Sequence, residues 1–217
     1  MSVNDAPVPL SRQQMAARAA IDIPEGWYVN LGIGVPTLVA DYVPPDREVI
    51  FHSENGILGV GPAPAEENRD PWLINAGKQH VTIHAGGALF HHADSFAMIR
   101  GGHLDLCVLG AYQVAANGDF ANWSTGAESA PAVGGAMDLA VGAKRIWVIM
   151  EHTTREGAPR LVTRCSYPLT AGRVVTRIYT NLAVLDVAET HLVVRSMVPG
   201  LTLAALQEVT EAELSLP

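Results

Sequence analysis

The sequence has few of the residues that mark several common classes of protein. Cysteine occurs only twice in 217 residues, as Cys107 and Cys165, and neither belongs to a Cys-x-x-Cys pair. We therefore expect two buried free thiols in a reducing compartment. Lys and Arg never form a run of five, and the formal net charge is −8. Because sequence-independent binding of nucleic acid needs clustered basic side chains, we expect no nucleic-acid partner.

Long apolar runs and an N-terminal targeting pattern are missing as well. No stretch approaches 18 uncharged apolar residues, so we expect no membrane span. The N-terminus lacks a positively charged start followed by an apolar core, so we expect no signal peptide. Together with the cysteine content, these features indicate a cytoplasmic protein. Residues 1–8 show no pattern and are expected to be disordered.

The rest of the sequence alternates between helical and strand patterns. Ser11-Arg12-Gln13-Gln14 has the form of a capping box and predicts a helix that Pro24 ends. Further helices are expected at 37–43, 136–144 and 201–210, and strands at 27–31, 49–52, 80–84, 104–109 and 146–150, with two or three more between 173 and 197. Asn117-Gly118 indicates a hairpin turn, and the segment 59–77 indicates a long loop. We expect an α/β fold in which an open, mostly parallel sheet is flanked by helices and the C-terminal third is rich in β-strands, with residues 1–217 forming a single domain.

A glycine-rich segment, Gly32-Ile33-Gly34, separates an expected strand from an expected helix. It is similar to the start of a dinucleotide-binding fingerprint, Gly-x-Gly-x-x-Gly. However, Thr37 stands where the third glycine is required, and a proline, Pro36, precedes it. The acidic residue that should close a second strand is also missing, because Glu48 begins its strand, so this binding mode is rejected. Two interpretations remain, namely a tight strand–helix turn or a bare backbone that lets a ligand approach a helix N-terminus.

Four of the eight histidines are close together in the sequence, but their spacing does not suit a metal site. His80 and His84 would share one face of a strand about 13 Å apart, at roughly 3.3 Å per residue, which is too far to bind one ion. His91 and His92 would point apart in an extended chain. We therefore expect no catalytic metal. The pair His91-His92 is either a surface pair or a contact for a substrate carboxylate.

A single carboxylate, Glu54, lies two residues past His52, the last residue of the strand expected at 49–52. Sites in open α/β sheets lie beyond the carboxyl ends of the strands, so Glu54 is a candidate catalytic residue, and a solvated turn acid is the alternative. Ser53 and Asn55 can hydrogen-bond its carboxylate or the nearby backbone. Gly56 permits a positive φ in the turn that follows.

Several segments together resemble a known family. FHSENGILGVGP, residues 51–62, is similar to the Ser-Glu-Asn-Gly segment in the B (beta) chains of family I CoA-transferases, and NLGIGVPTLVADYV, residues 30–43, is similar to the loop that precedes it. LINAGKQHVT, GGALFHHADSFAMIRGGHLDLCVLGAYQV, NGDFANW and GGAMDLAVGAK follow in the family's order and spacing. The resemblance covers roughly residues 10–200.

The resemblance implies that Glu54 is the nucleophile of a CoA-transferase and forms a covalent glutamyl-CoA thioester, with ping-pong kinetics. Backbone N–H groups of Gly135 and Ala136 are expected to donate to the oxyanion, whereas a simple packing turn is the alternative for Gly134-Gly135. The residues expected to bind substrate or CoA and to form the oxyanion loop are Gly32, Gly34, Ser53, Asn55, Gly134, Gly135 and Ala136. Coenzyme A is then a substrate, and no metal, nicotinamide or other cofactor is expected.

The resemblance also implies a separate A-type subunit, because this chain corresponds to the B half of the active unit. An A2B2 heterotetramer is expected, with acyl-CoA and carboxylic acid substrates. Residues 124–127, Ser-Thr-Gly-Ala, stand where the acetoacetate enzymes of the family tend to carry a Pro-Gly-Lys-like segment. The resemblance therefore implies 3-oxoadipate as the acceptor, with succinyl-CoA as the donor. Arg100, His91 and His92 are candidates for binding the distal carboxylate of that acceptor.

Three alternatives remain open at this point. The acceptor could instead be acetoacetate or another short acid. The chain could be a non-catalytic ligand-sensing domain of related fold, although it retains Ser53-Glu54-Asn55-Gly56. A sugar-phosphate isomerase with a similar sheet is the weakest alternative, because no suitable Lys, Asp and Glu set stands out.

Overall fold

Parallel strands form the centre of the fold, as the alternating helix and strand pattern predicts. In the computed structural model, which describes residues 7–126 and 132–217, β1 (Tyr28–Leu31) pairs in parallel with β2 (Ile50–Ser53) on one side and β5 (Leu106–Leu109) on the other. β8 (Ile146–Met150) and β10 (Val175–Thr180) continue the parallel arrangement beyond β5. The chain therefore leaves β1 toward opposite sides for β2 and β5, which makes the end of β1 a topological switch point.

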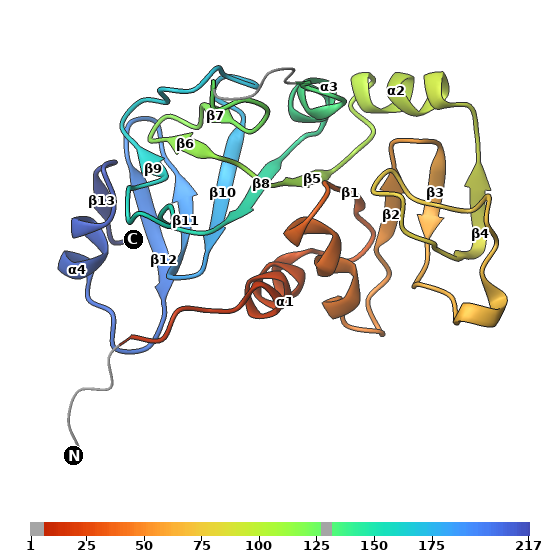
Figure 1. Ribbon diagram of the computed structural model, residues 1–217, viewed down its shortest axis with the longest axis horizontal. Coiled ribbons are helices and arrows are strands. Elements are labelled where there is room, and N and C mark those ends of the chain that lie inside the picture. The colour runs from red at the N-terminus through yellow and green to blue at the C-terminus, as the bar shows by residue number, and fades with distance from the viewer. Residues whose placement is uncertain (1–6, 127–131) are drawn as a thin grey trace, which may run out of the picture.

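Antiparallel pairs extend this sheet on both sides. β3 (Ile57–Val60) and β4 (Ile83–Leu89) follow β2, while β11 (Ala183–Val187) and β12 (Leu192–Met197) follow β10. At the outer edge, β13 (Leu214–Ser215) pairs in parallel with β12. The order across the described part of the sheet is β13-β12-β11-β10-β8-β5-β1-β2-β3-β4. The expected open, mostly parallel sheet and the β-rich C-terminal third are confirmed (Figure 1).

Helices cover the two faces of the sheet, because side chains of each strand point alternately to opposite sides. α1 (Arg12–Asp22) and the 3₁₀ helix η1 (Val35–Tyr42) pack on one face, where they contact Trp147 and Ile149 of β8. The predicted capping box of α1 is present in full, since the side chains of Ser11 and Gln14 bond to each other's backbone N–H groups.

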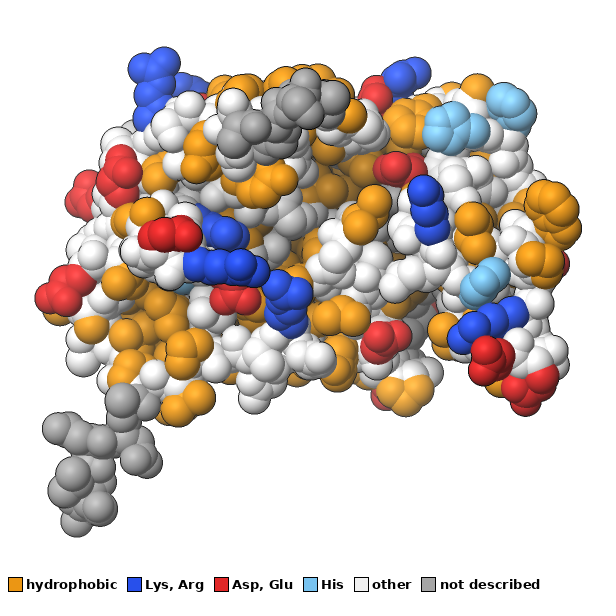
Figure 2. All heavy atoms as spheres, in the orientation of Figure 1, with side chains coloured by type: hydrophobic (Ala, Val, Ile, Leu, Met, Phe, Trp, Pro, Cys, Tyr) orange, Lys and Arg blue, Asp and Glu red, His pale blue; other side chains and the backbone are white. Residues whose placement is uncertain are grey.

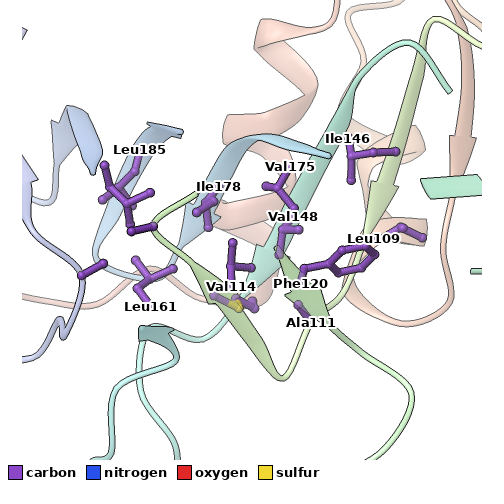
Figure 3. Close-up of a cluster of buried hydrophobic side chains, with 14 of the residues drawn as sticks. Leu109, Ala111, Val114, Phe120, Ile146, Val148, Leu161, Val175, Ile178 and Leu185 are labelled. Atoms are coloured by element: carbon purple, nitrogen blue, oxygen red, sulfur yellow. The ribbon is translucent and has the colours of Figure 1, made fainter. Parts of the chain in front are cut away.

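The opposite face carries three helices and a small second sheet. The helices are α2 (His92–Arg100), α3 (Ala136–Gly142) and α4 (Leu203–Glu208), and the small sheet consists of β6 (Gln113–Ala115), β7 (Phe120–Ala121) and β9 (Leu161–Val162). Figure 3 shows how Val114, Phe120 and Leu161 of the small sheet point toward Val148 and Ile178 of the large one. The turn predicted at Asn117-Gly118 joins β6 to β7, which confirms it.

Four local predictions differ from the structure. The helix expected at 37–43 is a 3₁₀ helix that begins earlier, at Val35, with Pro36 in its first turn. The long loop expected at 59–77 begins with β3, and the strand expected at 80–84 begins only at Ile83. Gly59 and Gly87 let β3 and β4 approach so closely that a Cβ on Gly59 would lie 3.0 Å from the Gly87 Cα. Glycines that serve a close approach look like loop residues in a sequence.

The fourth difference is helix α2, which was not predicted. The sequence reasoning placed His91 and His92 in an extended chain, but His92 begins the helix and His91 caps it. His80 lies outside β4, so it does not share a strand with His84. Cys107 is buried as predicted, whereas Cys165 is half-buried, and both thiols are free.

Two predictions concern residues outside the described part of the chain. One is the disorder expected at residues 1–6, and the other is the prediction of the acceptor from segment 124–127, as far as it depends on Ala127. Within the described residues, the longest apolar helices are too short to cross a membrane. On the face shown in Figure 2, most basic side chains stand beside acidic ones.

Candidate active site

Glu54 lies at the tip of the hairpin that joins β2 to β3. Ser53 pairs with Ile57 across the hairpin, and the Gly56 N–H donates to the Ser53 carbonyl at 2.9 Å. Gly56 has a φ of +113°, and a Cβ at this position would collide with the carbonyl oxygen of Phe90. Glycine is therefore required in this turn. The hairpin holds Glu54 beyond the carboxyl end of β2, where sites lie in open α/β sheets.

The two neighbours of Glu54 fasten the hairpin to an adjacent loop. The Ser53 hydroxyl accepts a hydrogen bond from the Ala76 N–H at 2.9 Å, and the Asn55 side-chain amide donates to the Ile74 carbonyl at 2.7 Å. The sequence left open whether these side chains would bind the Glu54 carboxylate or backbone, and these hydrogen bonds go to the backbone. Ser53 and Asn55 thus fix the base of the turn.

The first residues of α3 lie against the Glu54 carboxylate. A Cβ placed on Gly135 would be 2.9 Å from Oε2 of Glu54 and 3.0 Å from Cζ of Phe96 in α2. Gly135 has an ordinary φ of −82°, so a side chain here would be opposed by the tips of Glu54 and Phe96 and not by the backbone conformation. Of the two expected oxyanion donors, the Ala136 N–H already donates to the Val133 carbonyl at 3.3 Å. The structure brings Gly135 to Glu54, and donation to an oxyanion stays a prediction.

Helix α2 brings further side chains to this site. His91 is its N-cap, and His91 Nδ1 accepts a hydrogen bond from a first-turn N–H at 3.1 Å. The His92 ring packs on Phe96 with the ring centroids 4.8 Å apart. Asp94 in the first turn, Arg100 in the last turn and the two glycines that follow are the sequence signals that would have revealed this helix.

The charges around Glu54 oppose one another. Burial raises the pKa of the Glu54 carboxyl, nearby His92 lowers it, and nearby Asp138 raises it. Asp138 forms an ion pair with Arg100 at 2.7 Å, and the Arg100 guanidinium also lies 5.6 Å from the Phe96 ring centroid. Arg100 is therefore paired with the carboxylate of Asp138, whereas His92 lowers the pKa of Glu54. α2 and α3 pack against each other above the β2–β3 turn (Figure 1).

The segment Gly32–Gly34 follows β1 at the switch point of the sheet. The Gly32 N–H donates to the Val108 carbonyl at 2.8 Å, and a Cβ on Gly32 would lie 3.0 Å from Cδ2 of Leu109. Gly32 thus packs on the end of β5. Gly34 has a φ of +93° with open space around its Cβ position, and it starts η1. Contact of either glycine with a substrate stays a prediction.

A cavity of about 570 Å³ lies beside the base of the Glu54 turn, between η1 and the segment 60–84. His52 and Ser53 line it from β2, and its wall also carries apolar side chains such as Phe51 and Leu38. Its volume and mixed lining are those of a small-molecule site.

Sequence reasoning missed a buried polar cluster below Glu54. The cluster consists of Asn30 on β1, His52 on β2, Ser95 on α2 and Cys107 on β5, and none of these side chains is more than 4% exposed. His52, two residues before Glu54, was the available signal, because a histidine within an apolar strand needs hydrogen-bond partners. The partners of His52 come from two other elements, β1 and α2, so the sequence did not reveal them.

A desolvated glutamate held against a bare glycine backbone is the arrangement of an enzyme that uses a carboxylate in covalent catalysis. Comparison with known proteins identifies the class more closely. The family model for coenzyme A transferase matches residues 12–209. The chain belongs to the coenzyme A transferase family.

Individual relatives agree with this assignment. The chain is 58% identical over 206 residues to the B chain of 3-oxoadipate CoA-transferase from Acinetobacter baylyi, covering 94% of this chain and 95% of the relative. It is 46% identical to the B chain of a probable succinyl-CoA:3-ketoacid coenzyme A transferase from Bacillus subtilis, covering 95% of each. Among solved structures, an acyl-CoA transferase from Escherichia coli O157:H7 is similar in fold, with a TM-score of 0.74 at 20% identity, covering all of this chain and 45% of the longer one.

The first prediction concerns the turn that carries Glu54. Gly56→Ala should lower the free energy of unfolding by at least about 2 kcal/mol, because the new side chain strains φ and meets the Phe90 carbonyl. Gly26→Ala is the matched control, since its φ is +78° but its Cβ position has nothing within 4 Å. Denaturant unfolding measures the free energy of unfolding of both variants. An equal decrease in the two would contradict a contribution from the collision with the Phe90 carbonyl.

The second prediction concerns the protonation of Glu54. Asp138→Asn should lower the pKa of Glu54, because a repelling carboxylate is removed, and His92→Gln should raise it, because a favourable charge is removed. Carboxyl ¹³C NMR titration measures both shifts, with Glu54→Gln identifying the signal. Shifts in the same direction in the two variants would contradict the electrostatic description of the site.

Proposed function

We propose that this chain is the B half of a two-subunit enzyme that transfers CoA from succinyl-CoA to 3-oxoadipate. The observation that carries the proposal is the contact between the Glu54 carboxylate and the Gly135 backbone, in a chain that belongs to the coenzyme A transferase family. The name of the Acinetobacter relative, similar over nearly the whole chain, supports 3-oxoadipate as the acceptor. The name of the Bacillus relative supports succinyl-CoA as the donor.

The reaction begins with the Glu54 carboxylate as nucleophile. One of its oxygens attacks the thioester carbonyl of succinyl-CoA, the C–S bond breaks, and CoA leaves as a thiolate, so that a mixed anhydride of succinate and Glu54 forms. The thiolate then attacks the Glu54 carbonyl of this anhydride and expels succinate as a carboxylate. The enzyme now carries CoA as a glutamyl thioester.

The second half repeats these steps in reverse order with the acceptor. The acceptor carboxylate attacks the Glu54 thioester carbonyl and releases the CoA thiolate, which forms a new anhydride. The thiolate attacks the acceptor's acyl carbonyl, and Glu54 leaves as a free carboxylate. No net proton or electron is exchanged, so the site needs to stabilise oxyanions rather than to supply an acid or a base.

The surroundings of Glu54 suit these steps. Burial strips water from the Glu54 carboxylate, which is a weak nucleophile when hydrated, and the same loss of water raises its pKa. Gly135 leaves room for the thioester carbon next to the carboxylate, because no side chain stands between them. We assign Gly135 as an oxyanion donor, while Ala136 would first have to break its turn hydrogen bond to Val133.

Acetoacetate is the second candidate for the acceptor. The 46% identity to the Bacillus chain named for 3-ketoacids supports it, although the 58% identity to the chain named for 3-oxoadipate favours the dicarboxylic acid. A dicarboxylate needs a cationic partner for its distal group. We assign that role to His92 rather than Arg100, because Arg100 already pairs with Asp138.

An A-type subunit completes the enzyme in this proposal. The similar Escherichia coli chain is more than twice as long, and this chain covers 45% of it, which leaves room for a second half of comparable size. The two relatives compared above are each named as one subunit of their enzyme. We propose an A2B2 assembly, which mass photometry of the co-expressed subunits would test.

The third prediction is a covalent adduct. The enzyme co-expressed with its A-type subunit, given succinyl-CoA and no acceptor, should carry CoA on Glu54, because the glutamyl thioester has nothing to react with. Peptide mass spectrometry locates the adduct, and Glu54→Gln is the control that should lack it. Adduct on another residue, or full activity of Glu54→Gln, would contradict the mechanism. A higher kcat/KM for acetoacetate than for 3-oxoadipate would contradict the acceptor.

A further inference from the structure

A chain of buried hydrogen bonds connects β1, β2 and α2 below the catalytic glutamate. Asn30 Nδ2 lies 3.1 Å from Nδ1 of His52, and His52 Nε2 lies 2.9 Å from Oγ of Ser95. Asn30 is 2% exposed, His52 4% and Ser95 0%. Because buried polar groups are costly when unpaired, each of these contacts fixes the position of both partners.

The direction of each hydrogen bond follows from the partners. The Asn30 Nδ2 also donates to the His52 carbonyl at 3.1 Å, and Oδ1 accepts from the Cys107 thiol at 3.6 Å, so the orientation of the amide is set. An amide nitrogen can only donate, and His52 Nδ1 is therefore an acceptor. The proton of the neutral imidazole then lies on Nε2 and is donated to the Ser95 hydroxyl. Burial lowers the pKa of His52 to about 4, which keeps the ring neutral over the physiological range, while its hydrogen bonds select the tautomer.

Both ends of the His52–Ser95 hydrogen bond are next to the site. His52 is two residues before Glu54 on the same hairpin. Ser95 directly precedes Phe96, whose Cζ and the Oε2 of Glu54 both lie about 3 Å from the same Cβ position of Gly135. The hydrogen bond thus joins the strand that carries the nucleophile to the helix that encloses it.

Packing alone does not explain a polar contact at this place. Apolar side chains of similar volume would pack between β2 and α2 with equal or greater stability. The reason is that the hydrogen bonds of buried polar groups must first offset the free-energy cost of removing those groups from water. What a directional hydrogen bond adds is one defined orientation of the two elements. α2 otherwise meets the sheet through less directional contacts, such as Ile99 in the core.

We propose that the His52–Ser95 hydrogen bond is a positioning contact, which locks α2 onto β2 and thereby sets the Glu54 carboxylate against Gly135. The expected effect on the rate of CoA adduct formation rests on the function proposed above. Neither His52 nor Ser95 touches the reacting atoms, so both act through the placement of Glu54 and Phe96. A shift of the nucleophile by about 1 Å can cost up to roughly a hundredfold in rate.

The fourth prediction tests the positioning contact in the co-expressed enzyme. Ser95→Ala and His52→Leu should slow single-turnover adduct formation by about ten- to a hundredfold with little change in the KM for succinyl-CoA, because placement is lost and binding is retained. His52→Gln keeps a donor toward Ser95 and should recover most of the rate. Wild-type rates in Ser95→Ala and His52→Leu would overturn the proposal.

A matched control separates positioning from general stability. Thr210→Val removes another hydroxyl bonded to a buried imidazole, since Thr210 Oγ1 lies 2.8 Å from Nε2 of His152 in the C-terminal third. It should lower the melting temperature about as much as Ser95→Ala but leave the adduct rate unchanged. An equal loss of rate in Thr210→Val would show that stability alone is responsible and would overturn the proposal.

A second measurement does not depend on turnover. If the wild-type enzyme forms no adduct, the proposed function fails, but the ¹³C titration of the Glu54 carboxyl still decides the positioning claim. A loosened α2 admits water, so Ser95→Ala should move the pKa of Glu54 toward its ordinary value, whereas His52→Gln should not. An unchanged titration in Ser95→Ala would overturn the proposal.

Discussion

The Glu54 carboxylate lies so close to the Gly135 backbone that a Cβ on Gly135 would be 2.9 Å from Oε2 of Glu54. The rest of the site depends on this contact, because it removes water from a carboxylate and also leaves an open face on which a carbonyl carbon can be attacked. Three elements from distant parts of the sequence create it. Glu54 directly follows β2, Gly135 is the N-cap of α3, and Phe96 on α2 approaches the same point.

The sheet topology explains why Glu54 can be held so precisely. In a purely parallel sheet, β2 would run into a loop and a crossover helix, and its last side chains would depend on that loop. Here the chain turns back at once as β3, so the residues on both sides of Glu54 are fixed by strand pairing and by the Gly56 turn. Side chains on such rigid elements are positioned more accurately than those on long loops.

The sequence predicted most of the large elements because their signals are local. The capping box at Ser11, the apolar strand ending before Ser53 and the turn at Gly118 each need only a few neighbouring residues. Strands β3 and β4 were misplaced, because glycines that allow close packing look the same as loop glycines. Helix α2 was missed because His91 and His92 were placed in an extended chain. The Ser-Glu-Asn-Gly segment pointed to Glu54, but the His52–Ser95 contact joins residues 43 positions apart and has no local signal.

The contact between Glu54 and Gly135 can be tested without disturbing the backbone. Gly135 has a φ of −82°, which alanine adopts without strain, so Gly135→Ala adds a methyl group where the Glu54 carboxylate and the Phe96 ring meet. The decisive measurement is the rate at which this variant, assembled with its A-type subunit, forms the CoA adduct from succinyl-CoA. The account predicts a loss of at least about a hundredfold with a normally folded enzyme. Adduct formation at the wild-type rate would contradict it.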